Sequence, residues 1–107
     1  SHSRSHPNFR DLPESLRIAE LVESRQEIER HLGRAPDLFG IPYGSSRDWD
    51  AECGRLALSA GYSAVFAQSE NKRPEGTIGR SFVTRYDRLH HFRALLQGRF
   101  DAWEEWV

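Results

Sequence analysis

The sequence predicts a single α/β domain in which helices alternate with short parallel strands. Two apolar runs, at residues 37–41 and 63–67, are bounded by turn-forming residues and have the length of buried strands. Each run follows an amphipathic helical segment that ends in a glycine. Such alternation with short connections favours parallel strands joined by right-handed crossovers. Two or three strands make an incomplete sheet, so we expect residues 1–107 to be one partial domain whose first strands lie in upstream sequence.

The first helix is predicted to follow a polar N-terminal loop, residues 1–13. Asp11 is a suitable N-cap with Glu14 three residues later, and Pro13 is tolerated in the first turn. Gly33 provides the C-terminal stop. The predicted buried face carries apolar residues at helical spacing, namely Ile18, Leu21, Val22, Ile28 and Leu32. The predicted solvated face carries Glu20, Glu23, Arg25, Glu27 and Arg30.

The remaining elements follow from the same periodicities. The polar stretch 68–76 is predicted to be a surface loop, and residues 78–84 a third strand or extended segment. A third helix is expected from Leu89 to near Gly98, with a short helical turn at residues 100–106. The second amphipathic helix is marked by Trp49, Cys53, Leu56, Ala57 and Ala60.

The composition is that of an ordinary globular domain, with 37% hydrophobic and 29% charged residues. A net charge of −1 predicts neither nucleic acid nor an anionic membrane surface as a partner. No run of about 18 apolar residues is present, so no membrane span is expected. Cys53 is the single cysteine, which excludes an intrachain disulfide. The chain has no Met and begins within a motif, which favours a fragment of a longer protein and leaves its localisation open.

Metal chemistry is suggested by residues 2–7, His-Ser-Arg-Ser-His-Pro. The two imidazoles, His2 and His6, are four residues apart and can face one ion, and zinc accepts neutral imidazole nitrogen. The spacing alone also fits a flexible polar terminus or part of an affinity tag. A tag is disfavoured because a capped helix follows without a linker. The adjacent His90 and His91 are expected to point to different sides of a helix, so they are not predicted to chelate.

A second candidate is residues 39–44, Phe-Gly-Ile-Pro-Tyr-Gly, where the first predicted strand ends. Open α/β folds place their sites at the carboxyl ends of strands, although a strand that ends in a simple proline-glycine turn gives the same pattern. Trp49 could stack on a sugar ring, but a tryptophan at helical spacing with Cys53 and Leu56 is more often part of the core. Asp48 is interpreted as a helix cap.

Together these features resemble carbohydrate esterase family 4, the NodB-homology polysaccharide deacetylases. In that family a His-Ser/Thr-x-x-His-Pro segment supplies two metal-binding histidines, and it matches His2, Ser3, His6 and Pro7. A later Arg-x-Pro-Tyr/Phe-Gly segment forms one wall of the active-site groove and matches residues 40–44. The resemblance is clear over residues 1–67. Beyond them, residues 79–85 resemble the last strand of the poly-N-acetylglucosamine deacetylase-like branch.

The resemblance implies part of a distorted (β/α) barrel and a hydrolase that removes acetyl groups from an N-acetylated or O-acetylated polysaccharide or sugar. It implies that His2 and His6 hold a divalent metal, zinc ahead of cobalt, nickel or iron, and that the Tyr43 backbone N–H donates to the oxyanion. Pro42, Tyr43 and Trp49 would then contact substrate. A location in the cell envelope or outside the cell is also implied, with the bacterial cytoplasm as the alternative.

Three parts of the family pattern are not found. The Thr-Phe-Asp-Asp-Gly motif, which carries the third metal ligand and the catalytic base, is expected upstream of Ser1 in the same protein. Gly40 stands where many members have an arginine that pairs with the base, and the Leu-x-x-His motif of the general acid is not recognisable. The 107 residues alone are therefore expected to be inactive. A non-catalytic carbohydrate-binding or structural relative of the fold stays open as an alternative, as does a domain whose histidines bind nothing.

Overall fold

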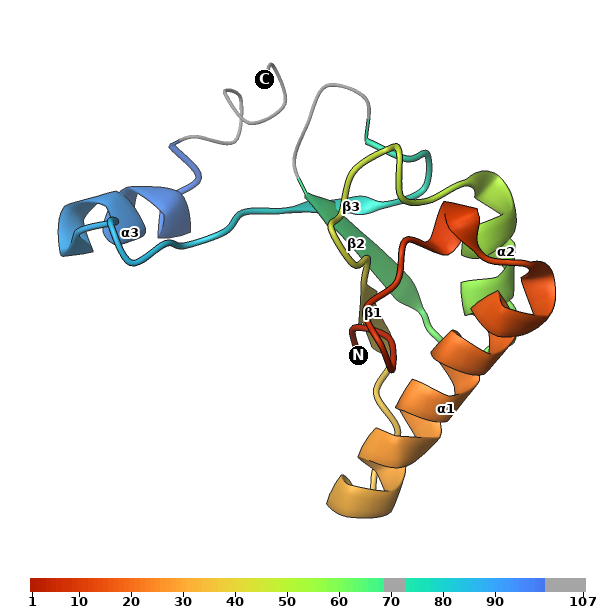
Figure 1. Ribbon diagram of the computed structural model, residues 1–107. Coiled ribbons are helices and arrows are strands. Elements are labelled where there is room, and N and C mark those ends of the chain that lie inside the picture. Colours follow the sequence, from red (N-terminus) through yellow and green to blue (C-terminus); the bar gives the residue numbers. More distant parts are fainter. Residues whose placement is uncertain (69–72, 100–107) are drawn as a thin grey trace.

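A small parallel sheet lies at the centre of the molecule, with two helices packed to one side of it (Figure 1). The computed structural model describes residues 1–68 and 73–99. The predicted helical turn at residues 100–106 lies outside these ranges. The elements are η1 (Phe9–Asp11), α1 (Glu14–Leu32), β1 (Leu38–Gly40), α2 (Ala51–Ser59), β2 (Ala64–Gln68), β3 (Ile78–Arg80) and α3 (Leu89–Leu96).

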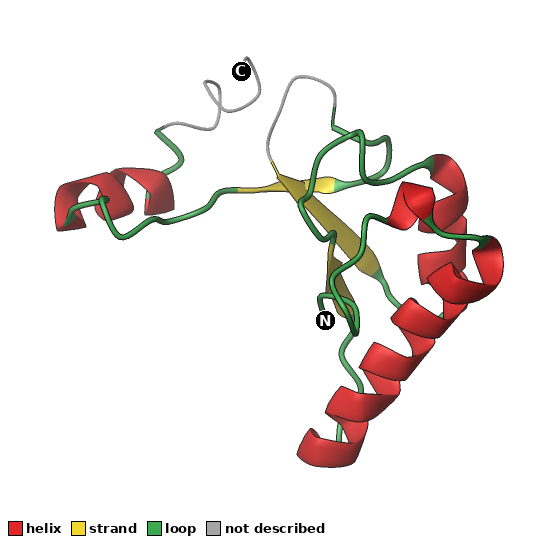
Figure 2. Ribbon diagram, in the orientation of Figure 1, coloured by secondary structure: helices red, strands yellow, loops and turns green. Residues whose placement is uncertain are grey.

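The sheet has the order β1-β2-β3, and both pairings are parallel, as the sequence predicted. Phe39 of β1 is in register with Val65 of β2, and Gln68 at the end of β2 is in register with Arg80 of β3. β3 ends at Arg80 and is therefore shorter than the predicted 78–84 segment. Figure 2 shows η1, α1 and α2 together on one side of the sheet and α3 apart from them on the other.

The core is built around Phe39, in the middle of β1, whose side chain is fully buried. Its ring centroid lies 5.7 Å from that of Phe9, 5.6 Å from Trp49 and 5.2 Å from Tyr62. Rings at these distances interact favourably beyond the area that they bury. The other core residues are Leu21, Ile41, Cys53, Leu56, Ala57, Val65 and Ala67.

The start of α1 differs from the prediction that Asp11 caps the helix. Asp11 closes the short 3-10 turn η1, and Pro13 is the N-cap without any side-chain hydrogen bond. The N-cap of η1 is Asn8, whose side-chain oxygen accepts a hydrogen bond from the Arg10 amide. At the other end the prediction is confirmed: Gly33 has a φ of 72° and its amide donates to the Glu29 carbonyl oxygen.

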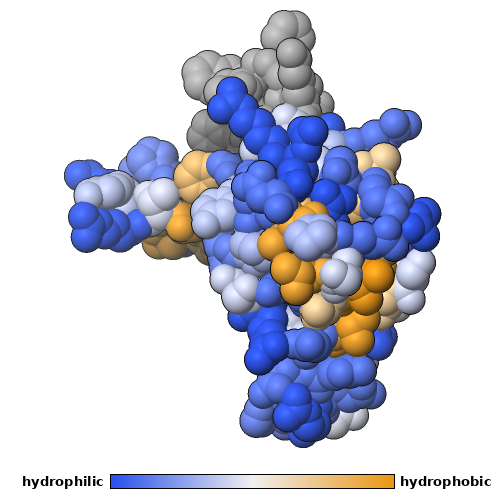
Figure 3. Space-filling view, turned by 45° about the vertical axis from the view of Figure 1, so that its right-hand side comes forward, coloured by the Kyte–Doolittle hydropathy of each residue, from blue (hydrophilic) through white to orange (hydrophobic). Residues whose placement is uncertain are grey.

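The buried face of α1 is also narrower than the apolar periodicity predicted. Only Leu21 and Ser24 are buried, whereas Leu32 is 76% exposed and Ile18 is 40% exposed. For Leu32 the reason is visible in Figure 1, where the C-terminal end of α1 extends beyond both α2 and the sheet. Figure 3 shows a patch of apolar side chains within hydrophilic surface on the side of the helices. Within the described ranges, no helix is both long and apolar enough to cross a membrane.

The N-terminus of α2 is capped by Asp50, not by Asp48 as predicted. The Asp50 side chain accepts from the Cys53 amide at 2.9 Å and contacts Arg17 Nη1 of α1 at 3.3 Å. Burial alone would raise the pKa of Asp50, but its hydrogen bonds to Cys53 and the charges of Arg17 and Arg10 hold that pKa below its ordinary value. Burial also raises the pKa of the Cys53 thiol to about 11, so Cys53 packs as a neutral core residue.

We expect Asp50→Ala to lower the free energy of unfolding by about 1–2 kcal/mol, because it removes the cap of α2 and the contact with α1. Asp50→Asn keeps a capping oxygen and should cost less. Because the native pKa is lowered, the Asp50 contribution is complete above the ordinary aspartate pKa and is lost as pH falls through the native value. Urea unfolding of both variants at neutral and acidic pH measures this. A loss for Asp50→Ala that does not shrink in acid would contradict the ionic contribution.

Candidate active site

The N-terminal residues lie along the open edge of β1. The Ser1 nitrogen donates to the Leu38 carbonyl oxygen at 2.7 Å, and the Gly40 amide donates to the Ser1 carbonyl oxygen at 2.9 Å. This is the hydrogen-bond pattern of a parallel pair centred on Phe39. It carries His2 to the carboxyl end of β1, the end at which α/β folds place their sites.

The His2 ring is held by a second contact with β1. Its Nδ1 lies 2.8 Å from the Gly40 carbonyl oxygen. Since a carbonyl oxygen only accepts, Nδ1 is the donor in this contact, and in the neutral ring the Nε2 lone pair is then left for another group. A backbone carbonyl on the second ring nitrogen is the usual arrangement behind a metal-binding histidine. Gly40 is thus beside His2 in space, and a Cβ at position 40 would lie 3.4 Å from His2 Nδ1.

His6 returns to the same place after a tight loop. Its amide donates to Ser3 Oγ at 3.0 Å, and its ring centroid lies 4.8 Å from that of His2 in an edge-on arrangement. Both imidazoles are exposed. The structure therefore brings the two predicted ligands together, with geometry that fits two nitrogen ligands of one divalent ion.

The third predicted side chain, Tyr43, lies against His6. The two ring centroids are 4.7 Å apart, and Tyr43 is 58% exposed. Within the described part of the chain, the Tyr43 amide donates to no acceptor. The residue has a φ of 64°, in the left-handed region. An exposed ring and an unpaired amide at this position suit a group that faces a substrate.

Backbone strain is concentrated at the same point. The non-glycine residues with positive φ in the described ranges are Ser3, His6 and Tyr43, and all three belong to the two predicted motifs. Such conformations cost free energy and gather at functional sites, where the surrounding structure holds them. The strain therefore supports a functional interpretation of both loops together.

Hydrogen bonds to β2 and β3 hold the loop at residues 41–44 in place. The Ile41 amide donates to the Phe66 carbonyl oxygen at 2.9 Å, and the Gln68 amide donates to the Gly44 carbonyl oxygen at 2.8 Å. Arg80 Nη2 donates to the Ile41 carbonyl oxygen at 3.1 Å. The Arg80 Nε atom is buried and has no hydrogen-bond partner among residues 1–68 and 73–99. No sequence pattern indicated this role of Arg80, because β3 and the loop are far apart in the chain.

Three expectations for neighbouring residues need correction. Trp49 does not present a face to substrate: it is 3% exposed and stacks with Phe39, so the core interpretation is confirmed. The Pro42 side chain is also buried, so it shapes the loop and does not contact substrate. Asp48 is buried, and instead of capping α2 it accepts from the Ser45 amide at 2.8 Å and from Asn8 Nδ2 at 2.9 Å.

His90 and His91 are far from these loops. They lie on α3, which is separate from the sheet, and both are exposed (Figure 1). The expectation that they point to different sides of the helix is wrong, since their Nε2 atoms are 3.1 Å apart. Long side chains on adjacent positions can turn toward each other even though their Cβ atoms diverge.

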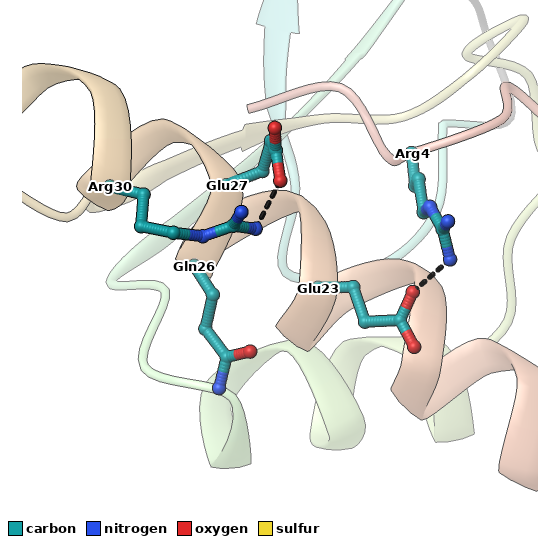
Figure 4. Close-up of a pocket in the computed structure, with 5 residues that line it drawn as sticks. All are labelled: Arg4, Glu23, Gln26, Glu27 and Arg30. Atoms are coloured by element: carbon teal, nitrogen blue, oxygen red, sulfur yellow. Dashed lines mark hydrogen bonds and ion pairs between the residues drawn. The ribbon is translucent and has the colours of Figure 1, made fainter.

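A polar groove lies next to the histidine loop and is shown in Figure 4. Its charged groups are already paired with each other, because Arg4 forms an ion pair with Glu23 and Arg30 forms one with Glu27. Neither histidine of the loop lines this groove. We therefore place the candidate site at His2, His6 and Tyr43.

The described residues 1–68 and 73–99 contain no group of three or more His, Cys, Asp or Glu side chains that could hold a metal ion. His2 and His6 fit as two ligands, since the His2 ring is oriented by Gly40 and both rings are exposed. Zinc sites have three or four protein ligands. A complete site therefore needs at least one ligand from outside the described residues.

The parallel sheet and the paired histidine and Pro-Tyr-Gly loops form an α/β domain with its candidate site at the carboxyl end of β1. Residues 1–65 match the family model for polysaccharide deacetylase, and the chain belongs to that family. In fold it is similar to IcaB from Ammonifex degensii, with a TM-score of 0.56 and 23% sequence identity. The match covers 88% of this chain and 37% of that chain, so this chain spans little more than a third of its structural neighbour. None of the curated proteins compared with the chain matches it.

Proposed function

We propose that the chain supplies part of the active site of a metal-dependent deacetylase that hydrolyses acetyl groups on an N-acetylated or O-acetylated polysaccharide or sugar. Membership of the polysaccharide deacetylase family supports the class of reaction. The observation that carries the site is the convergence of His2, His6 and Tyr43 at the carboxyl end of β1. The same residues were selected from two sequence motifs that are well separated along the chain.

In this proposal His2 and His6 hold the cation, most simply zinc, through ring nitrogens. The chemistry that a divalent cation supplies when bound is to polarise the acetyl carbonyl and make water more acidic. The third ligand and the base are to come from an upstream segment of the same protein that carries paired aspartates. The 107 residues alone would then be inactive.

Tyr43 would act through its backbone and its ring. Its N–H is directed by the strained loop between Pro42 and Gly44 and would donate to the oxygen that becomes negative as water adds to the acetyl group. A donor that is fixed before reaction has no reorganisation to undergo during it, which is why a strained loop suits the task. The exposed ring would lie against the sugar.

The test is an assay of the full-length protein on a chitooligosaccharide after metal removal and again with added zinc or cobalt. We expect activity to disappear with the metal and to return with it, and we expect His6→Ala to lose both the bound metal and the activity. His31→Ala is the matched control, because His31 is exposed on α1 and pairs with Glu27.

Full activity of His6→Ala, or of the metal-free protein, would overturn the metal role. Binding of the oligosaccharide without any hydrolysis by the wild-type protein would instead favour a non-catalytic carbohydrate-binding relative of the fold.

A further inference from the structure

The loop between the two histidines is attached to α1 by a single carboxylate. Glu20 Oε2 accepts from the Arg4 amide at 2.8 Å and from the Ser5 amide at 2.9 Å. Glu20 Oε1 accepts from the Ser5 hydroxyl. Three donors of one loop thus converge on one side chain that lies well beyond the loop in the sequence. The amphipathic pattern had assigned Glu20 to the solvated face of α1, so this contact is a finding of the structure.

From these contacts we infer that Glu20 is a positioning residue, which holds the His2–His6 loop in the conformation that binds the metal. The inference rests on the proposed function, because it concerns the affinity of that same site for its metal. The hydrogen bonds of Glu20 go to Arg4 and Ser5, which lie between the two histidines in the sequence.

The loop needs such an anchor because its conformation is not one that the chain adopts unaided. Ser3 and His6, on either side of the Glu20 contacts, both have positive φ angles of 67° and 58°. Non-glycine residues leave this region unless surrounding contacts hold them. The Ser3 hydroxyl accepts from the His6 amide within the loop, but Glu20 links the loop to another element. Loss of Glu20 would therefore let His6 move relative to His2.

The anchor is rigid because its own helix is fixed to the core at the next residue. Leu21 is fully buried, and its carbonyl oxygen accepts from the buried Tyr62 hydroxyl at 3.0 Å. Burial alone would raise the pKa of Glu20, but hydrogen bonds from Ser5 and Arg4 and the Arg4 charge hold that pKa below its ordinary value. An ionised carboxylate has only acceptor atoms, so Glu20 can accept from all three loop donors at once.

The matching control is one turn away on the same helix. Glu23 pairs with the Arg4 side chain, so it contacts the same loop through an exposed ion pair and not through the backbone (Figure 4). Exposed ion pairs of this kind contribute little. Glu20→Ala and Glu23→Ala therefore make the same truncation on the same helix and differ in whether the loop backbone loses its acceptor.

The experiment measures zinc affinity of the full-length protein by competition with a chromophoric chelator, for the wild type and both variants. Glu20→Ala removes both carboxylate oxygens, so the Arg4 amide, the Ser5 amide and the Ser5 hydroxyl lose their acceptor on α1. We therefore expect Glu20→Ala to weaken zinc binding by about 10–100-fold. Glu23→Ala should stay within about twofold of the wild type. In the metal-free protein, hydrogen exchange of the Arg4 and Ser5 amides should become about tenfold faster in Glu20→Ala alone.

Equal zinc affinity of Glu20→Ala and the wild type overturns the inference while the proposed function stands. Absence of zinc binding by the wild type overturns the proposed function and this inference with it. If Glu20→Ala does not fold, Ser5→Ala takes its place, since it removes one donor and leaves α1 intact. Ser5→Ala should weaken zinc binding about threefold or more, the effect of one lost hydrogen bond, and an unchanged affinity overturns the inference.

Discussion

Phe39→Ala is expected to lower the free energy of unfolding by about 3–5 kcal/mol, the range for removal of a buried aromatic ring. The Phe39 side chain is fully buried and its ring packs against those of Phe9, Trp49 and Tyr62. These three rings come from η1, the loop before α2 and the turn before β2, so collapse around the cavity would require several elements to shift together. A domain whose total stability is about 5–15 kcal/mol would lose much of it.

Urea or thermal unfolding followed by circular dichroism measures this loss. Leu58→Ala is the control, because Leu58 lies on α2 with 64% of its surface exposed, and it should change stability by no more than about 0.5 kcal/mol. A loss below about 1 kcal/mol for Phe39→Ala would contradict the central position given to this residue.

The same substitution should also disturb the candidate site. Phe39 is flanked in β1 by Leu38 and Gly40, whose backbone groups hold Ser1 and His2. The packing of the aromatic cluster and the orientation of the His2 ring are therefore linked through one strand.

Local pattern was sufficient to predict the elements that form this centre. The apolar runs predicted β1 and β2 to within one residue at each end, and parallel pairing followed from the helix between them. The structure brings the motif histidines and Tyr43 together, and the resemblance to the family had placed them in one site although periodicity alone cannot relate their segments.

The supporting residues could not be predicted because their roles depend on contacts between distant segments. Glu20 has the pattern of a solvated residue, and only the fold brings the loop amides of Arg4 and Ser5 to it. By residue type, Asp48 and Asp50 are equally good N-caps. In the structure Asp50 caps α2, whereas Asp48 accepts a hydrogen bond from Asn8. The sequence also predicted too many buried residues on α1, because apolar periodicity does not show where a helix extends beyond the elements that cover it.

Gly44→Ala is the second substitution with a large expected effect, a loss of stability of about 2–5 kcal/mol. Gly44 has a φ of 87°, a conformation that costs an alanine about 1–2 kcal/mol. A Cβ there would also lie 3.0 Å from both the Gln68 backbone nitrogen and Arg80 Nη2. The arginine can move, but the Gln68 amide belongs to β2 and donates to the Gly44 carbonyl oxygen, so the loop must shift instead. Such overpacking adds about 1–3 kcal/mol.

Gly33→Ala separates the two contributions. Gly33 has a φ of 72°, but a Cβ there would meet nothing within 4 Å. It should therefore cost only the conformational part, about 1–2 kcal/mol. Equal losses for the two variants in urea unfolding would show that the close approach of β2 to Gly44 contributes nothing.

The two variants should differ still more in activity than in stability. Gly44 adjoins Tyr43, whose N–H is the proposed oxyanion donor, and a shift of the loop would move that donor away from the developing charge. Loss of one such donor lowers kcat by about 10²–10³-fold. We expect Gly44→Ala to approach this loss in the full-length protein, at a temperature where the variant is folded. Its zinc affinity should stay close to that of the wild type, because His2 and His6 lie on the other loop.

Gly33→Ala should keep its kcat, because Gly33 ends α1 well away from that loop. A Gly44→Ala protein that is folded, binds zinc and retains full kcat would remove the Tyr43 loop from the mechanism and leave the histidines as the only part of the site contributed by this chain.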